Sequence, residues 1–190
     1  MALKDENGVY TFHVLDLKLS AVTLRTNKAG IYYKAELACD EVLAEQIECY
    51  GIAVSILGMP TADFENEANT VATKLYGAPE GTFTSGSITN IFREGMSAEK
   101  NAARGEIAIY GNPYIQLKDE TVLMGSNGTS KSMKDVMEYL NENFASLETA
   151  EQETVKAFYA QWADAITAWN LENLAAAIIP TIPEEEDEQA

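Results

Sequence analysis

The alternation of apolar and polar residues over positions 31 to 39 is the feature that most constrains the fold of this chain. One side carries Ile31, Tyr33, Ala35, Leu37 and Cys39. Positions 32, 34, 36 and 38 are more polar as a group, so a period of two residues predicts a strand buried on one face. Further strand segments are predicted at 9–24, 52–56, 70–76, 87–92, 106–110, 114–117 and 121–124. Roughly eight short strands separated by turn signals are typical of an antiparallel sandwich or a partly open barrel.

Two places interrupt this pattern. Within 9–24 the apolar face changes between Val14 and Leu15, which predicts a bend or a bulge. After the strand at 31–39, Asp40 is a good N-cap, and helical spacing of apolar residues then continues to Tyr50. Gly51 would end this helix, so we expect a short helix that connects two strands.

The last third of the chain changes to a helical period. Ser130 or Ser132 caps a predicted helix whose apolar residues are Met133, Val136, Met137, Leu140 and Phe144. Thr149-Ala150-Glu151-Gln152 has the form of a capping box and opens a second helix. The apolar stripe of that helix consists of Val155, Tyr159, Trp162, Ile166 and Trp169. Both helices are expected to pack on or beside the sheet.

The predicted fold class is α+β and mainly β: an antiparallel, Ig-like β-sandwich with a short strand-connecting helix and C-terminal helices. We divide the chain into a β-sandwich module with its closing helix at 1–146, a helical element packed on it at 147–178, and an acidic disordered tail or truncated linker at 179–190. The predicted core residues are Ile31, Tyr33, Leu37, Leu43, Ile47, Ile52, Val54, Ile109, Ile115 and Leu117.

Charge and composition exclude several classes of protein. The net charge is −17, from 13 basic and 30 acidic residues, which argues against nucleic acid and anionic membranes as partners. No run of 18 apolar residues is present, so membrane insertion is not expected. The single histidine, His13, excludes sites built on two imidazoles. Cys39 and Cys49 would lie about 15 Å apart along the predicted helix, so we expect free, buried thiols.

The loops that resemble ligand sites depart from the known motifs. The acidic segment 63–69 begins like a calcium loop, but Ala68 stands where glycine is needed and Lys74 where glutamate is needed. A solvated loop is therefore the favoured interpretation, with an irregular calcium site as the alternative. The segment 125–130 lacks the ending of a phosphate-binding loop and is interpreted as the connection into the helix. We assign no catalytic residue, no cofactor and no metal.

Tyrosines offer one candidate ligand site. A sugar-stacking platform could use exposed aromatic rings beside a carboxylate, because ring faces pair with sugar C–H surfaces. Tyr32 and Glu36 share strand parity, so they can line one outer surface about 13 Å apart. The candidate platform consists of Tyr32, Glu36, Tyr76, Tyr110 and Tyr114. The competing interpretation is that these tyrosines simply pack, since aromatic residues are common in strands.

A resemblance to known proteins lies in residues 22–145. Its matching positions are Arg25, Gly30, Ile31, Lys34, Ala35, Glu48, Tyr50 and Gly51. The segment resembles a module of large secreted and cell-surface proteins of Clostridia-type gut and rumen bacteria, although Tyr32 and Tyr33 stand where the family pattern has Arg and Phe. The resemblance implies a β-sandwich that accompanies carbohydrate-binding, adhesive or anchoring domains.

These observations together predict a non-catalytic structural or adhesion module of a bacterial surface or secreted protein, with carbohydrate binding as an added function. Its partners would be neighbouring domains of a larger chain, glycans or other surface proteins, and its location extracellular or at the cell surface. The alternatives are a carbohydrate-active enzyme that uses paired carboxylates, and a phage or particle structural protein with a cytoplasmic or virion location.

Overall fold

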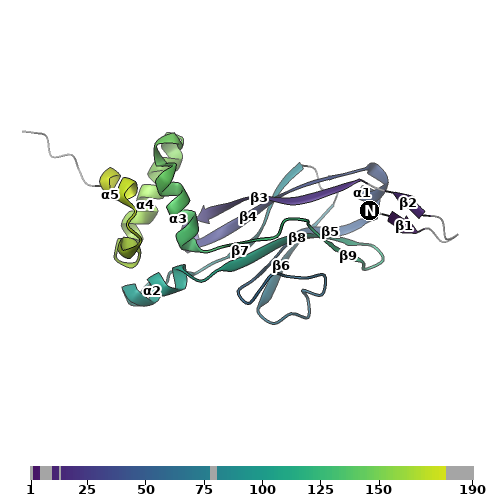
Figure 1. Ribbon diagram of the computed structural model, residues 1–190, viewed down its shortest axis with the longest axis horizontal. Coiled ribbons are helices and arrows are strands. Elements are labelled where there is room, and N and C mark those ends of the chain that lie inside the picture. Colours follow the sequence, from purple (N-terminus) through teal and green to yellow (C-terminus); the bar gives the residue numbers. More distant parts are fainter. Residues whose placement is uncertain (1, 5–9, 13, 78–80, 179–190) are drawn as a thin grey trace, which may run out of the picture.

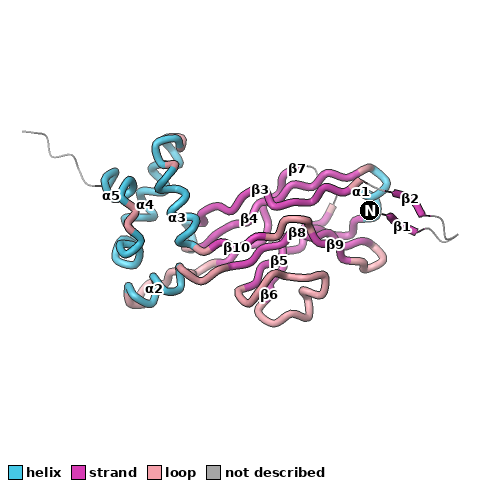
Figure 2. Tube along the Cα trace, viewed as in Figure 1, coloured by secondary structure: helices cyan, strands magenta, loops and turns pink. Residues whose placement is uncertain are grey.

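The protein is an α+β structure with two main antiparallel sheets, of three and five strands, and a set of helices at one end (Figure 1). The computed structural model describes residues 2–4, 10–12, 14–77 and 81–178. His13 and the acidic segment 179–190 lie outside the described residues. The strands run along the long axis of the molecule, and the C-terminal helices lie beyond their ends on one side (Figure 2).

The three-stranded sheet has the order β3-β4-β7. Its strands are β3 (Leu15–Arg25), β4 (Gly30–Cys39) and β7 (Gly81–Ile88). The 3₁₀ turn η1 (Thr26–Lys28) joins β3 to β4. A bulge lies between Leu19 and Ala21 of β3, so β3 and β4 stay paired from Leu15↔Cys39 to Arg25↔Gly30 with one extra residue in β3. β3 is an edge strand of this sheet.

The five-stranded sheet has the order β10-β8-β5-β6, with β9 also paired to β8. Its strands are β5 (Ile47–Ser55), β6 (Thr70–Tyr76), β8 (Ile109–Leu117), β9 (Val122–Met124) and β10 (Thr129–Lys131). The predicted strand at 70–76 and the hairpin of 114–117 with 121–124 are both confirmed, the latter by pairs such as Ile115↔Leu123.

A separate pair of strands, β1 (Ala2–Lys4) and β2 (Tyr10–Phe12), lies at the end of the molecule opposite the C-terminal helices (Figure 1). Among the described residues these strands pair only with each other. The change of face predicted between Val14 and Leu15 therefore marks the boundary between β2 and β3, and the bulge itself lies further along, in β3.

The helix predicted after Asp40 is shorter than expected. Asp40 caps α1 (Glu41–Gln46) by accepting a hydrogen bond from the Leu43 amide at 2.9 Å, but β5 begins at Ile47. The prediction that the helix continues to Tyr50 is wrong. A bulge between Ile47 and Cys49 interrupts the alternation at the start of β5, so its first residues kept an apparent helical spacing. The strand predicted at 52–56 falls within β5 as far as Ser55.

The chain segment between Ile88 and Ile109, which leads from one sheet to the other, also differs from the prediction. The expected strand at 87–92 is wrong beyond Ile88, where β7 ends, and the expected strand at 106–110 starts only at Ile109. Helix α2 (Ala98–Gly105), which we did not predict, lies between them. Its buried residues are Asn101 and Gly105, and the Asn101 side-chain amide accepts a hydrogen bond from the N–H of Arg93 and donates one to its C=O. The inward face therefore has no large apolar residues that would reveal the helix.

The C-terminal helices begin with α3 (Met133–Glu142), followed by the 3₁₀ turn η2 (Phe144–Ser146). Ser132 caps α3 through a capping box with Asp135, which confirms one of the two predicted caps.

Helix α4 (Thr149–Ile166) is bent at Trp162 and is followed by η3 (Thr167–Trp169) and α5 (Glu172–Ile178). The capping box of α4 lies one residue earlier than predicted, on Glu148 and Glu151. The Gln152 amide instead donates hydrogen bonds to the carbonyls of Phe144 and Leu147.

All ten predicted core residues are buried, which confirms the orientation of the strands. One cluster joins side chains of both sheets to the C-terminal helices: it contains Tyr33 of β4, Ile52 of β5 and Phe158 of α4. The helices therefore share a core with the sheets. A second cluster, around Leu17, Leu37 and Ile115, lies nearer α1.

The outer face of the five-stranded sheet has a small core of its own. The loop between β5 and β6 places Phe64 against Tyr114, with ring centroids 4.5 Å apart, beside Cys49 and Ala53. Cys49 is buried here and Cys39 is half-buried in β4, and both thiols are free. The prediction of free thiols is confirmed, and that of buried thiols holds for Cys49 but not for Cys39. The helical spacing used to argue it is wrong, because the two residues lie in strands of different sheets.

Candidate functional site

The residues of the predicted tyrosine platform are divided between the two sheets. Tyr32 and Glu36 belong to β4 of the three-stranded sheet, whereas Tyr76 is in β6 and Tyr110 in β8 of the five-stranded sheet. Tyr76 is 68% exposed and Tyr110 is half-buried. Two pairs share a strand: Tyr32 and Glu36 in β4, and Tyr110 and Tyr114 in β8.

Tyr114 cannot present its ring to a ligand. Its side chain is fully buried beneath Phe64, and its hydroxyl donates a hydrogen bond to the carbonyl of Thr73 at 3.1 Å. Burial raises the pKa of this phenol. The expectation that Tyr114 lines a platform is corrected, because the loop between β5 and β6 folds over the sheet and covers it, which strand periodicity does not reveal.

A charged patch surrounds Tyr32 and Glu36. The guanidinium of Arg25 lies 4.8 Å from the centre of the Tyr32 ring, and Arg25 also donates a hydrogen bond to Ser87 at 2.8 Å. Lys18 lies 3.8 Å from the carboxylate of Glu36. One face of the Tyr32 ring is therefore occupied by a cation, and a planar ligand has only the remaining ring surface available.

The acidic loop at 63–69 uses its carboxylates within the protein. Glu67 accepts hydrogen bonds from the amide and the hydroxyl of Thr61, and Glu65 pairs with Lys74 at 2.6 Å. Asp63 accepts a hydrogen bond from the side chain of Asn66 at 2.5 Å. These contacts give the loop a structural role, which is to hold Phe64 over the sheet. Within 14–77 and 81–178 no group of three or more His, Cys, Asp or Glu is placed to hold a metal ion.

The loop at 125–130 completes one edge of the three-stranded sheet. The side-chain amide of Asn127 pairs with both main-chain groups of Leu19, at 2.6 and 3.0 Å, and the Ser126 amide donates to the carbonyl of Leu17 at 3.2 Å. This loop therefore takes the place of a neighbouring strand along the first half of β3. The second half of β3 has no such partner among these contacts.

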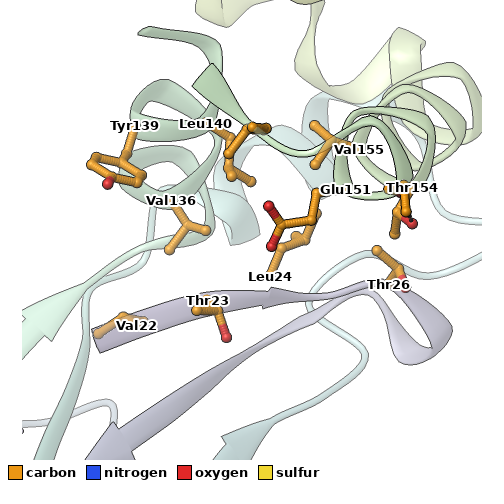
Figure 3. Close-up of a pocket in the computed structure, with 12 residues that line it drawn as sticks. Val22, Thr23, Leu24, Thr26, Val136, Tyr139, Leu140, Glu151, Thr154 and Val155 are labelled. Carbon is orange, nitrogen blue, oxygen red and sulfur yellow. Dashed lines mark hydrogen bonds between the residues drawn. The ribbon is translucent and has the colours of Figure 1, made fainter. Parts of the chain in front are cut away.

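A groove runs along that second half, and sequence reasoning missed it. It consists of three adjoining cavities of about 430, 470 and 320 Å³, which are lined in turn by residues of β3 and η1 between Leu19 and Thr26 and have Val22 in common. The first is bounded opposite β3 by β10, and the last by α3 and α4 (Figure 3). We call this feature the β3 groove.

The walls of the β3 groove are mostly apolar. Val22 and Leu24 of β3 face α3 and α4 across it, and Figure 3 shows Glu151 of α4 between the helix and Leu24. Tyr139 of α3 is 62% exposed at its rim. Apolar walls with a few polar groups are typical of binding surfaces. A pocket between strand and helices depends on the tertiary packing, so no local sequence signal could have located it.

Main-chain N–H and C=O groups of β3 also point into this groove. Leu17 and Leu19 turn their main-chain groups away from β4, toward the 125–130 loop. Alternation along the strand, reset by the extra residue at the bulge, then turns the N–H and C=O groups of Val22 and Leu24 away from β4 as well. The β3 groove therefore offers hydrogen-bond donors and acceptors spaced as in a strand.

Hydrogen bonds lower the pKa of Glu99 at the start of α2 and of Asp119 in the turn before Thr121. None of the described helices is long and apolar enough to span a membrane.

Comparison with protein-family models, curated proteins and solved structures found no match for this chain.

Proposed function

We propose that this protein is a non-catalytic structural module, a spacer or presentation domain of a bacterial surface or secreted protein, built on an Ig-like β-sandwich. The observation that carries the proposal is the position of the two ends of the described chain. Strand β1 lies at one end of the long axis, and α5, which ends at Ile178, lies at the other (Figure 1). Neighbouring domains attached at these two ends would be held apart by the full length of the module.

The packing of the sheets supports the sandwich part of the proposal. Inward side chains of β4 and β5, such as Tyr33 and Ile52, belong to one buried cluster. A Cβ added to Gly111 of β8 would lie 2.5 Å from the ring of Tyr33, so the two sheets are in close contact there. Two antiparallel sheets that share their inner side chains are the basis of a sandwich core.

An in-line spacer makes a prediction about length. In proteins of one, two and three copies joined end to end by the same short linker, we expect the maximum dimension in small-angle X-ray scattering to grow by about one module length per added copy. The reason is that entry and exit lie at opposite ends of the long axis. A two-copy protein barely longer than one copy would contradict the proposal, and circular dichroism of each protein serves as the control for folding.

Glycan binding is a second candidate, favoured by the half-buried patch of Tyr32, Glu36, Arg25 and Lys18. Tyr32 and Glu36 lie on the same side of β4, with Arg25 and Lys18 of β3 beside them, so an aromatic ring lies among charged groups that can bond hydroxyls. On an array of plant, mucin and cell-wall polysaccharides, we expect Tyr32→Ala to reduce any binding about tenfold or more. Tyr76→Ala is the matched control, because Tyr76 belongs to the other sheet. Absence of binding by the wild-type chain, or equal loss in both variants, would reject the patch.

A further inference from the structure

We propose that the β3 groove binds the β1–β2 strand pair of a second copy of this chain, which adds to the free edge of β3 and joins copies head to tail. The proposal goes beyond a spacer role, because it assigns a specific acceptor surface and a specific donor. It rests on three observations: the open edge of β3, the β1–β2 pair that makes no other strand contact among the described residues, and the location of this edge and this pair at opposite ends of the molecule.

The acceptor is the second half of the β3 edge, beyond Leu19, whose main-chain groups are already bonded by Asn127. From Ser20 to Thr26 the groove extends about 20 Å at about 3.3 Å per residue, enough for a strand of several residues, and β4 is the only described strand paired with β3. Along it, Val22 and Leu24 turn their main-chain groups outward, as derived above. Strand addition to such an edge is a recurring way in which proteins bind extended segments.

The groove also has room for the side chains of an added strand. β10, the edge strand of the second sheet, bounds the first cavity opposite β3, so two sheet edges lie on either side of it. Further along, Val136 and Leu140 of α3 and Val155 of α4 provide apolar contacts for side chains that point inward. A strand inserted here would be paired and partly buried at the same time.

The donor is the pair β1 and β2. Within the described chain these strands pair only with each other, and a lone two-stranded unit is marginally stable in water. An added neighbour strand would therefore stabilise it. The acceptor segment of β3 lies next to α3, whereas β1 and β2 lie at the opposite end of the molecule (Figure 1). Contact between the two in different copies is heterologous and generates chains of molecules.

Charge makes contacts between copies sensitive to salt. The chain carries 30 acidic residues and a net charge of −17, so most contacts between two copies are repulsive. Residues 1–14 share this character, with Asp5 and Glu6 against Lys4. The groove is lined by Lys131, Asp135 and Glu151. Association should therefore strengthen as salt screens the repulsion between the acidic bodies.

The test uses two variants that each lack one half of the contact. Val22→Pro removes a main-chain N–H that points away from β4, and proline is tolerated at such positions of edge strands. Val22→Thr keeps the N–H and the branched shape and is its matched control. Deletion of residues 1–12 removes the donor. Circular dichroism melting of every variant checks the fold.

Light scattering coupled to gel filtration gives the readout at increasing protein concentration. We expect the wild type and Val22→Thr to form a series of oligomers, more so at higher salt. Val22→Pro and the deletion should each be monomeric, with an apparent dissociation constant weakened about tenfold or more. Mixed together, these two variants should form a dimer that cannot grow further. Val22→Pro retains the donor strands, and the deletion variant retains the acceptor edge, so only one contact can form.

Three results would overturn the proposal. A wild type that stays monomeric at every concentration would show that the strands do not join copies, whether the groove stays open or is filled by the same chain. A folded Val22→Pro that associates like the wild type would show that the β3 edge is not the acceptor. A mixture that remains monomeric would show that the two halves do not bind each other.

Discussion

Replacement of Tyr33 by alanine is expected to lower the free energy of unfolding by about 3–5 kcal/mol, the range found when a large buried aromatic side chain is removed. Tyr33 is fully buried between the two sheets, and its hydroxyl donates a hydrogen bond to the carbonyl of Ile109 in β8. Its ring also fills the space above Gly111. The loss would be measured by urea denaturation followed by circular dichroism.

Two further variants separate the contributions of Tyr33. Tyr33→Phe keeps the ring and removes the hydroxyl, so we expect a smaller loss of about 1–2 kcal/mol from the unpaired Ile109 carbonyl. Gly111→Ala should cost about 1–3 kcal/mol, because its Cβ would lie 2.5 Å from the Tyr33 ring. In the Tyr33→Ala background the same Gly111→Ala change should cost little or even stabilise. Additive losses would mean that the ring and Gly111 are not in contact.

Replacement of Trp169 by alanine is expected to cost a similar amount, about 3–5 kcal/mol, for a different reason. Trp169 joins the C-terminal helices to α2. It is 5% exposed, its ring centre lies 5.8 Å from that of Phe92, and its six-membered ring touches Gly105, the last residue of α2. Its removal leaves a cavity between these elements, so thermal and urea unfolding should both report the loss.

Trp169→Phe is the control for this prediction. The indole Nε1 has no hydrogen-bond partner among the described residues, so phenylalanine loses volume but no bond to another protein group. We expect a cost of about 1–2 kcal/mol. Gly105→Ala should be tolerated better in this background than in the wild type, because its Cβ would lie 2.6 Å from an atom that phenylalanine lacks. Equal costs for the alanine and phenylalanine variants would show that Trp169 packs elsewhere.

Prediction from sequence succeeded where one face of an element is buried and the other is solvated. The strand at 31–39 has this property, and its alternate residues Ile31, Tyr33 and Leu37 are all buried as predicted. It failed at 47–50, where a bulge interrupts β5, and at α2, whose buried residues are Asn101 and Gly105. In both cases large apolar residues do not mark the inward side, because a bulge shifts the register of β5 and a polar and a small residue fill the inward face of α2.

The candidate sites show the same division. Strand parity correctly placed Tyr32 and Glu36 on one side of β4, since parity is a local property of an extended chain. It could not show that Tyr114 lies beneath Phe64, or that the other tyrosines belong to a different sheet. The β3 groove had no signal at all in the sequence, because its walls come from β3, β10, α3 and α4.

What the sequence by itself determined is therefore the type of most elements, the inward side of the half-buried strands and the absence of a recognisable catalytic motif. Periodicity and capping are set by neighbours three or four residues away, so they can be read along the chain. Only the tertiary structure decided which strands became edges, which surfaces the loops covered and where a groove stayed open. These properties depend on contacts between segments such as Leu19 and Asn127, more than one hundred residues apart, whose pairing no local pattern encodes.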